Sequence, residues 1–225
     1  MKILPGFEIE ENFISIKMTP PTINKHIEKL IKKLGATHEP DYIDVEPEPG
    51  AEVGDCFPAV QKKIASDGGK MIMGWQIWQS KNIVEAECHA VWEDPEGEIH
   101  DITPKSIGIN RILFVEDADM VYKERQVDNI RMNITNNKLV DDLIGVSQAI
   151  HRFDNKGERA DLYDLSDVLT EKEIKHREYL LELKERINAI LSQNGNRDSL
   201  CPCGSSSKFR DCHGKDLAKR IAKEV

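Results

Sequence analysis

Residues 82–103 have the pattern of a β-hairpin, and this hairpin constrains the fold more than any other stretch of the chain. Residues 82–92 are rich in β-branched and aromatic side chains, and the sequence Asp-Pro-Glu-Gly at positions 94–97 is a strong turn signal before residues 98–103. One face of the first strand is apolar and includes Cys88, which we therefore place in the core. His89 points to the opposite, half-polar face, which is typical of either a cleft or a solvent-exposed surface.

Further β-like segments at residues 71–79 and 111–117 extend the hairpin to an antiparallel sheet, and a short strand is expected at residues 11–18. Residues 39–55 carry seven carboxylates, three prolines and no Lys or Arg, which predicts an extended surface loop without a regular element. Apolar periodicity and helix-capping signals predict four helices. They cover residues 19–34, 56–68, 139–151 and 170–195.

Charge and hydropathy exclude several classes of protein. The formal net charge of −9 argues against a general nucleic-acid binder. No segment approaches the ~20 apolar residues that cross a bilayer, and the N-terminal residues lack the apolar run of a signal peptide. A cytoplasmic protein without membrane insertion is therefore expected. Its five cysteines fit metal binding or a free thiol in a reducing compartment better than a disulfide framework.

Four metal-binding side chains lie within thirteen residues near the C-terminus: Cys201, Cys203, Cys212 and His213. Three thiolates and one imidazole match the closed tetrahedral shell of a structural zinc site. So short a segment cannot bury a core of its own. The bound metal would have to supply its folding free energy, which is about 10 kcal/mol or more for small zinc sites.

The cluster resembles the SEC-C motif, a zinc knuckle first recognised at the C-terminus of the SecA preprotein translocase motor. The resemblance rests on Cys-Pro-Cys-Gly-Ser at 201–205, the Lys/Phe/Arg stretch that follows, and Cys-His-Gly at 212–214. It covers about residues 199–214 and implies bound zinc and a small module that docks a protein or peptide partner. It does not imply translocation. The basic tail after it is predicted to be helical and to contact the rest of the chain rather than an acidic partner or nucleic acid.

Thiol catalysis needs a nucleophile, a base and a group that orients the base, and the chain offers Cys56, His89 and Asp101. Cys56 is predicted at the start of a helix, where free N–H groups and the helix dipole favour a thiolate, although Asp55 opposes this. His89 and Asp101 belong to the two strands of the hairpin. They lie directly opposite each other on one face if the loop has an odd number of residues, and on opposite faces if it is even. The sequence leaves both registers open.

These residues resemble transglutaminase-like cysteine enzymes, which are papain-related, and the arylamine N-acetyltransferases. The resemblance rests on Cys56, on His-Ala-Val-Trp at 89–92 and on Asp-Ile-Thr-Pro at 101–104. It implies an α+β fold in which a helix packs on an antiparallel sheet, with Cys56 as nucleophile, His89 as general base and Asp101 as orienting acid. The implied reaction is hydrolysis of an amide or transfer of its acyl group. Gln76 is a candidate second oxyanion donor beside the Cys56 N–H, and His100 is an alternative base.

We therefore predict three parts: a transglutaminase-like α+β domain over residues 1–160, a helical segment over 161–195, and the zinc-binding motif with its basic tail over 196–225. The alternative function is a non-enzymatic zinc-binding adaptor with an inert fold of the same type. In that case Cys56 is a small buried residue, and His89 and Asp101 form an ordinary cross-strand pair.

Overall fold

The computed structural model describes residues 17–36, 38–105, 108–162 and 164–222, and these form two compact units. The sheet unit comprises Lys17–Lys123 and Val127–Ile134. The helical unit comprises residues 124–126, 135–162 and 164–222. The strand predicted at residues 11–18 lies outside the described residues except for its last two, of which Met18 pairs with Gln79. The domain boundaries at residues 160 and 195 stay predictions.

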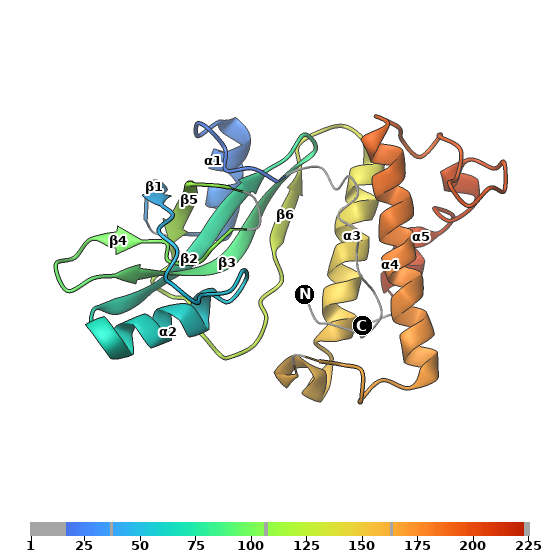
Figure 1. The fold of residues 1–225 in the computed structure, drawn as a ribbon. Coiled ribbons are helices and arrows are strands. Elements are labelled where there is room, and N and C mark those ends of the chain that lie inside the picture. The colour runs from blue at the N-terminus through green and yellow to red at the C-terminus, as the bar shows by residue number, and fades with distance from the viewer. Residues whose placement is uncertain (1–16, 37, 106–107, 163, 223–225) are drawn as a thin grey trace. The chain divides into compact units, whose positions relative to one another are not determined.

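The sheet unit is built on an antiparallel sheet with the strand order β1-β5-β2-β3-β4, and β6 pairs with the outer edge of β3 (Figure 1). The strands are β1 Asp41–Asp44, β2 Lys70–Gln79, β3 Ile83–Glu93, β4 Ile99–His100, β5 Arg111–Glu116 and β6 Ile130–Asn133. The residues that directly follow β1 and β4, Val45 and Asp101, form a parallel β-bridge with each other. The backbone N–H of Glu46 donates to the carbonyl oxygen of Asp101 at 2.8 Å. The sheet is therefore nearly closed, and Asp101 lies at the seam.

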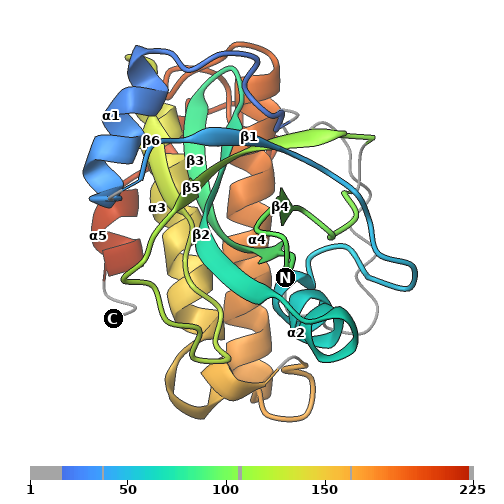
Figure 2. The same cartoon turned by 90° about the vertical axis from the view of Figure 1, so that its left-hand side faces the viewer.

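Two helices cover one face of this sheet, at opposite ends of β2 and β3 (Figures 1 and 2). Helix α1, Lys25–Leu34, packs Ile27 and Leu30 on the end of the sheet that contains Val84 and Ala86. Helix α2, Cys56–Asp67, packs on the other end, in a cluster of Cys56, Val60, Ala90 and Ile102. The alternate residues along the strands point to the opposite face of the sheet and fill it. They are Ile43, Ile72, Val91, Ile112 and Phe114.

The structure confirms the mixed α+β class and the antiparallel sheet, and it corrects several predicted elements. Residues 39–55 contain β1, because Ile43 is buried in the core and the strand pairs with β5. Helix α1 begins at Lys25 rather than near residue 19, since the Asn24 side chain accepts hydrogen bonds from the N–H groups of His26 and Ile27. Strand β4 is shorter than predicted, and β6 was not predicted at all.

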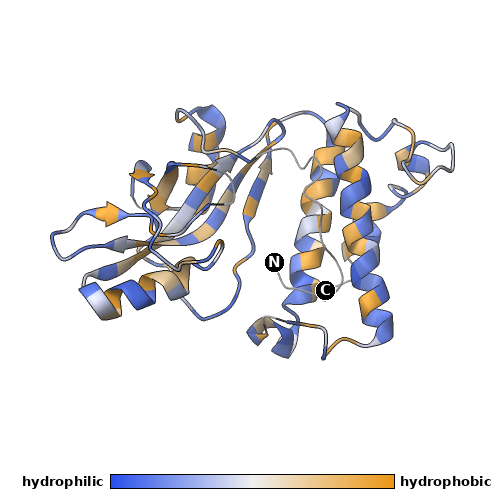
Figure 3. Cartoon of the chain, in the orientation of Figure 1, coloured by the Kyte–Doolittle hydropathy of each residue, from blue (hydrophilic) through white to orange (hydrophobic). Residues whose placement is uncertain are grey.

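The helical unit pairs α3, Lys138–Asp154, with α4, Glu171–Ser192, and both helices carry apolar positions among polar ones (Figure 3). The predicted capping box of Thr170 and Glu173 is present at the start of α4. Leu180, Leu183 and Ile187 of the predicted apolar stripe are fully buried. The predicted helical tail forms α5, Leu217–Ala222, which buries Leu217 and Ile221, and residues 223–225 lie outside the described chain.

Candidate functional site

Cys56 is the first residue of α2 and is buried, with 5% of its surface exposed. Pro58 lies in the first turn, where its missing N–H costs no hydrogen bond. The preceding residue, Asp55, makes no side-chain hydrogen bond to cap the helix. The free N–H groups of the first turn are therefore not occupied by the Asp55 carboxylate, and they leave a positive helix end beside the Cys56 sulfur.

The hairpin loop places His89 and Asp101 on one face of the sheet. Strand β3 ends at Glu93 and β4 begins at Ile99, so the loop has five residues, an odd number. Its turn is held by Asp94, whose carboxylate accepts hydrogen bonds from the N–H groups of Glu96 and Glu98. The prediction that the two residues are directly opposite is wrong, because Trp92 pairs with His100 and this register places Asp101 across from Val91. His89 and Asp101 are diagonal neighbours instead.

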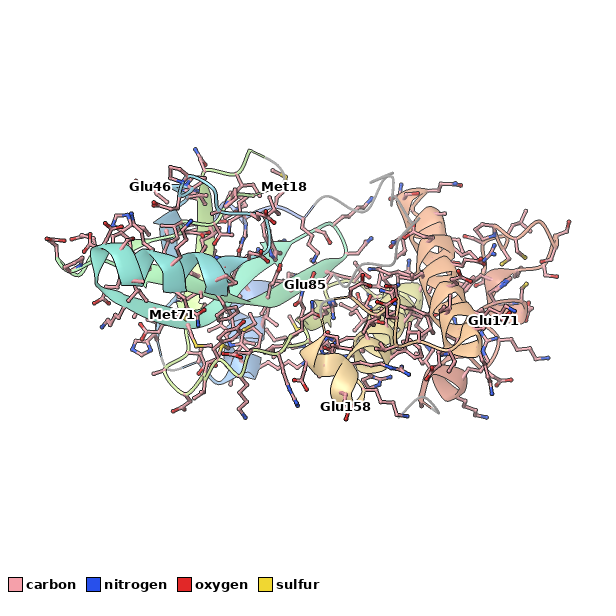
Figure 4. The ribbon with its side chains drawn as sticks, turned by 60° about the horizontal axis from the view of Figure 1, so that its bottom comes forward. Met18, Glu46, Met71, Glu85, Glu158 and Glu171 are labelled. Atoms are coloured by element: carbon pink, nitrogen blue, oxygen red, sulfur yellow. The ribbon has the colours of Figure 1, made fainter. Side chains whose placement is uncertain are left out.

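The diagonal offset still brings the two side chains together. His89 Nε2 lies 3.2 Å from Asp101 Oδ1, and Oδ1 also accepts the backbone N–H of Thr103 at 3.1 Å. Both side chains are buried, Asp101 completely. The interpretation of the His89 face as a solvent-exposed surface is therefore wrong. Glu85, on the same face of β3 and labelled in Figure 4, is buried too, with its carboxylate paired to Lys17 and Arg131.

His89 lies at a gap in the strand pairing. Along the outer edge of β3, β6 pairs with Ile83–Ala86 and β4 with Trp92 and Glu93. Between them, residues 87–91 pair with β2 alone among the described strands. The N-terminal end of α2 packs near this gap, and the Cys56 thiol is close enough to His89 to influence the pKa of its imidazole. Asp101 lies against Nε2 of the His89 ring rather than against the other ring nitrogen, Nδ1.

The environment of His89 favours its protonated form. Burial lowers the pKa of the imidazole, but hydrogen bonding to Asp101 and then to Cys56 outweighs this and raises the pKa to about 9. Burial alone would raise the pKa of the Asp101 carboxyl, but contacts with His89 and Lys105 keep it below its usual value. A charged imidazolium beside the Asp101 carboxylate is the form that these shifts favour.

This raised pKa predicts a pH-dependent contribution to stability. The folded pKa of about 9 exceeds the unfolded value of ~6.5, so protonation of His89 stabilises the fold fully below pH ~6.5, and the stabilisation is lost as the pH rises through about 9. The contribution is on the order of 3 kcal/mol. Chemical denaturation of the wild type and His89→Gln between pH 6 and 10 measures it. A constant difference in free energy of unfolding across that range would contradict it.

The sequence did not reveal the buried ammonium group of Lys105 in this site. Its Nζ lies 2.5 Å from Asp101 Oδ2, 3.4 Å from His89 Nε2 and 3.3 Å from Gln76 Oε1. The Lys105 side chain is 8% exposed. Gln76 comes from β2, where Gly74 pairs with His89, and its Nε2 has no hydrogen-bond partner among the described residues. The sequence carries no signal for the placement of Lys105, because residues 101–105 form no helix in which a spacing of four would bring the two side chains together.

Two other candidate residues of the hairpin have different surroundings. Cys88 packs against the core beneath α1, and burial raises the pKa of its thiol to about 12. This agrees with its predicted core position. His100, the alternative base, contacts Glu46 through Nδ1 at 3.3 Å and Asp94 through Nε2 at 3.2 Å. Its ring is thus held by carboxylates of the loop and the turn, not by Asp101.

A second site is formed by Cys201, Cys203, Cys212 and His213 in the helical unit, whose ligand atoms all lie within 4.8 Å of one another. His213 Nδ1 is 3.2 Å from the Cys201 sulfur and 3.3 Å from the Cys212 sulfur, and the Cys203 and Cys212 sulfurs are 3.6 Å apart. The edges of a zinc tetrahedron with three sulfurs and one nitrogen are about 3.5–3.8 Å long. The donor set and its spacing therefore fit a metal ion, consistent with the predicted zinc.

Backbone hydrogen bonds and the packing of one aromatic ring hold the four ligand residues close together. The N–H of Cys201 donates to the carbonyl oxygen of Ser207 at 2.8 Å, and Leu200 pairs with Lys208. The fully buried Phe209 packs against Gly214, where a β-carbon would meet its ring at 2.6 Å. The Ser205 hydroxyl and backbone N–H lower the pKa of the Cys203 thiol to about 6, which favours the thiolate that a metal requires.

Comparison with protein-family models, with curated proteins and with solved structures gave no match. The resemblances to SEC-C motifs and to transglutaminase-like enzymes therefore rest on the residues quoted above. No helix in the described part of the chain has the length and apolar character needed to span a membrane.

Proposed function

We propose that the chain is a cytoplasmic cysteine hydrolase or acyl transferase that acts on an amide through Cys56, His89 and Asp101. The observation that carries this proposal is the buried pair of His89 Nε2 and Asp101 Oδ1, 3.2 Å apart, beside a cysteine at a helix start, Cys56, that influences the pKa of the imidazole. In this proposal Cys56 is the nucleophile, His89 its base and Asp101 the group that orients the base, although the three come from separate segments. The α+β fold with an antiparallel sheet is compatible with the transglutaminase-like architecture.

The proposed reaction has two stages. His89 Nδ1 accepts the thiol proton of Cys56, and the thiolate attacks the substrate carbonyl carbon. The backbone N–H of Cys56 donates to the developing oxyanion, and the unpaired amide nitrogen of Gln76 is the candidate second donor. The C–N bond then breaks as His89 returns its proton to the leaving amine. Water or another nucleophile finally cleaves the thioester, giving hydrolysis or acyl transfer.

Alkylation of Cys56 tests this proposal. We expect iodoacetamide to modify Cys56 rapidly at neutral pH and His89→Ala to slow the reaction by about 100-fold, since the thiolate loses its counter-charge. Peptide mass spectrometry measures the rates at each cysteine. Cys88 is the internal reference, because partial burial raises the pKa of its thiol to about 12.

His100→Ala is the matched control. It removes an imidazole from the same hairpin that contacts Glu46 and Asp94, so the Cys56 rate should stay at the wild-type value. Equally slow labelling of Cys56 in the wild type and in His89→Ala would overturn the enzymatic proposal.

The second candidate function is a non-enzymatic adaptor. The burial of Cys56 in a cluster with Val60, Ala90 and Ile102 favours it, because a free cysteine in an apolar cluster is usually inert. In this case the His89–Asp101 pair stabilises the hairpin only. The alkylation experiment decides between the two functions, since the adaptor gives slow labelling that does not depend on His89.

We also propose that the metal of the C-terminal cluster is zinc in a structural SEC-C module that docks a protein or peptide partner. Three thiolates and one imidazole complete a four-coordinate shell without an open position, which is typical of a structural rather than a catalytic ion. Exposed basic residues of the same segment, among them Arg210 and Arg220, provide polar contacts for such a partner.

A further inference from the structure

The buried ammonium group of Lys105 has no role in the proposed series of proton transfers. The Asp101 carboxylate is engaged on both oxygens: Oδ1 accepts the Thr103 N–H and lies 3.2 Å from His89 Nε2, and Oδ2 forms an ion pair with Lys105 Nζ. Asp101 is completely buried and Lys105 nearly so. Burying two charged side chains is costly unless each has a partner, so this pair requires an explanation.

We infer that Lys105 is a positioning residue of the Cys56 site: its ammonium group holds Oδ2 of Asp101, leaves Oδ1 to His89 and balances the charge of the buried carboxylate. The inference deepens the proposed function and rests on it for its catalytic meaning. A carboxylate with one oxygen fixed by a cation cannot rotate freely, so the direction of the His89 Nε2 hydrogen bond is fixed as well. Lys105 also donates to Gln76 Oε1, which holds the Gln76 amide in one orientation.

Charge balance gives Lys105 its second effect. The groups that face His89 are Cys56 from α2, Asp101 after β4, Lys105 from the following loop and the uncharged Gln76 from β2. When a proton moves from Cys56 to His89, the site holds two negative and two positive charges. Without Lys105 the same state would carry a buried net charge of −1, and the unbalanced Asp101 would bind the imidazolium more tightly.

An imidazolium that is held too tightly is a poor acid for the leaving amine. Lys105 therefore limits the proton affinity of His89 in two ways, by neutralising Asp101 and by placing a like charge 3.4 Å from Nε2. Its removal should raise the pH at which His89 loses its proton. A lysine that contributed only to stability, without an electrostatic effect on His89, would change the free energy of unfolding and leave that pH unaltered.

The test is an NMR titration of the His89 ring in the full-length chain, for the wild type, Lys105→Met and Lys105→Arg. We expect Lys105→Met to raise the titration midpoint by about one pH unit, and Lys105→Arg, which keeps the charge, to stay within a few tenths of the wild type. Lys70→Met is the matched control, because it removes an ammonium paired with Glu93 on the exposed end of the same sheet. Its midpoint should equal that of the wild type.

If Lys105→Met does not fold, Lys105→Gln removes the charge with less loss of polarity and should give the same rise. An unchanged His89 midpoint in a folded, uncharged Lys105 variant would overturn the inference. The pH profile of Cys56 alkylation in the same variants separates this outcome from failure of the proposed function. A raised midpoint with alkylation independent of His89 would leave Lys105 assigned to the His89–Asp101 pair and would refute the enzyme.

Discussion

Removal of the proposed zinc ion from the cluster of Cys201, Cys203, Cys212 and His213 is expected to unfold the surrounding segment, residues 197–214, and to leave the sheet unit folded. Phe209 is the only large apolar side chain that these described residues bury, so their own burial cannot balance the entropy of ordering them. Metal binding contributes about 10 kcal/mol or more in such sites, and no other contact of the segment is comparable. The loss should therefore be local and nearly complete.

Hydrogen exchange with and without a chelator measures this loss. Amides of residues 197–214 should lose their protection, whereas tryptophan fluorescence should not change, because Trp75, Trp78 and Trp92 all lie in the sheet unit. Metal analysis should give one zinc per chain. The double variant Cys201→Ser and Cys212→Ser should lose this zinc, and Cys88→Ser, outside the cluster, should retain it. Zinc that persists at near-stoichiometric amounts in the double variant would refute the assignment.

The metal cluster could be predicted from the sequence because its four ligands lie within thirteen residues. Local backbone geometry decides whether such ligands converge, and the spacing of Cys201, Cys203 and Cys212 already restricts it. The residues of the Cys56 site, by contrast, are far apart in the sequence. They come from a helix, a strand and the seam of a nearly closed sheet, so their distances depend on tertiary structure.

Turn chemistry explains why part of the Cys56 site was still predictable. The turn at Asp94 was predicted, but the sequence left the length of the loop open. The loop in the structure has an odd length, which puts His89 and Asp101 on one face. The offset of two residues could not be predicted, because the Trp92–His100 register and the Val45–Asp101 bridge fix it together. Lys105 was missed for a related reason: the reach of a long side chain back into a site leaves no periodic signal.

Two short edge strands, β1 and β6, were also not predicted from the sequence. Strand β1 lies in a segment with so many carboxylates and prolines that its composition predicts a loop, yet Ile43 is buried and β5 supplies the backbone partners. Strand β6 has no residue fully buried, and it forms because β3 offers a free edge. Tertiary pairing overrides weak local preference in both cases. Helix α4, by contrast, carries its own capping box and apolar stripe and was predicted nearly to its ends.

Breaking the buried ion pair between α3 and α4 should have the second largest effect, a loss of about 3–5 kcal/mol in the free energy of unfolding of the helical unit. Arg177 Nε donates to Asp154 Oδ1 at 2.8 Å, and its NH2 group donates to Oδ2 at 3.0 Å, with both residues buried. In Arg177→Met the Asp154 carboxylate loses its guanidinium partner but remains away from water. The sequence did not indicate this pair, because Arg177 interrupts the apolar stripe of α4.

Denaturation followed by far-UV circular dichroism measures the loss, since tryptophan fluorescence reports on the sheet unit alone. Lys175→Met is the matched control: it breaks the exposed pair with Glu171 on the same helix and should cost less than about 0.5 kcal/mol. Replacing both partners, Arg177→Met with Asp154→Leu, should recover much of the stability, because no buried charge is left. Equal losses in Arg177→Met and Lys175→Met would show that the buried pair contributes no more than a surface contact. The cost of Arg177→Met thus arises from the remaining charge, which is the same electrostatic principle that makes Lys105 necessary beside Asp101.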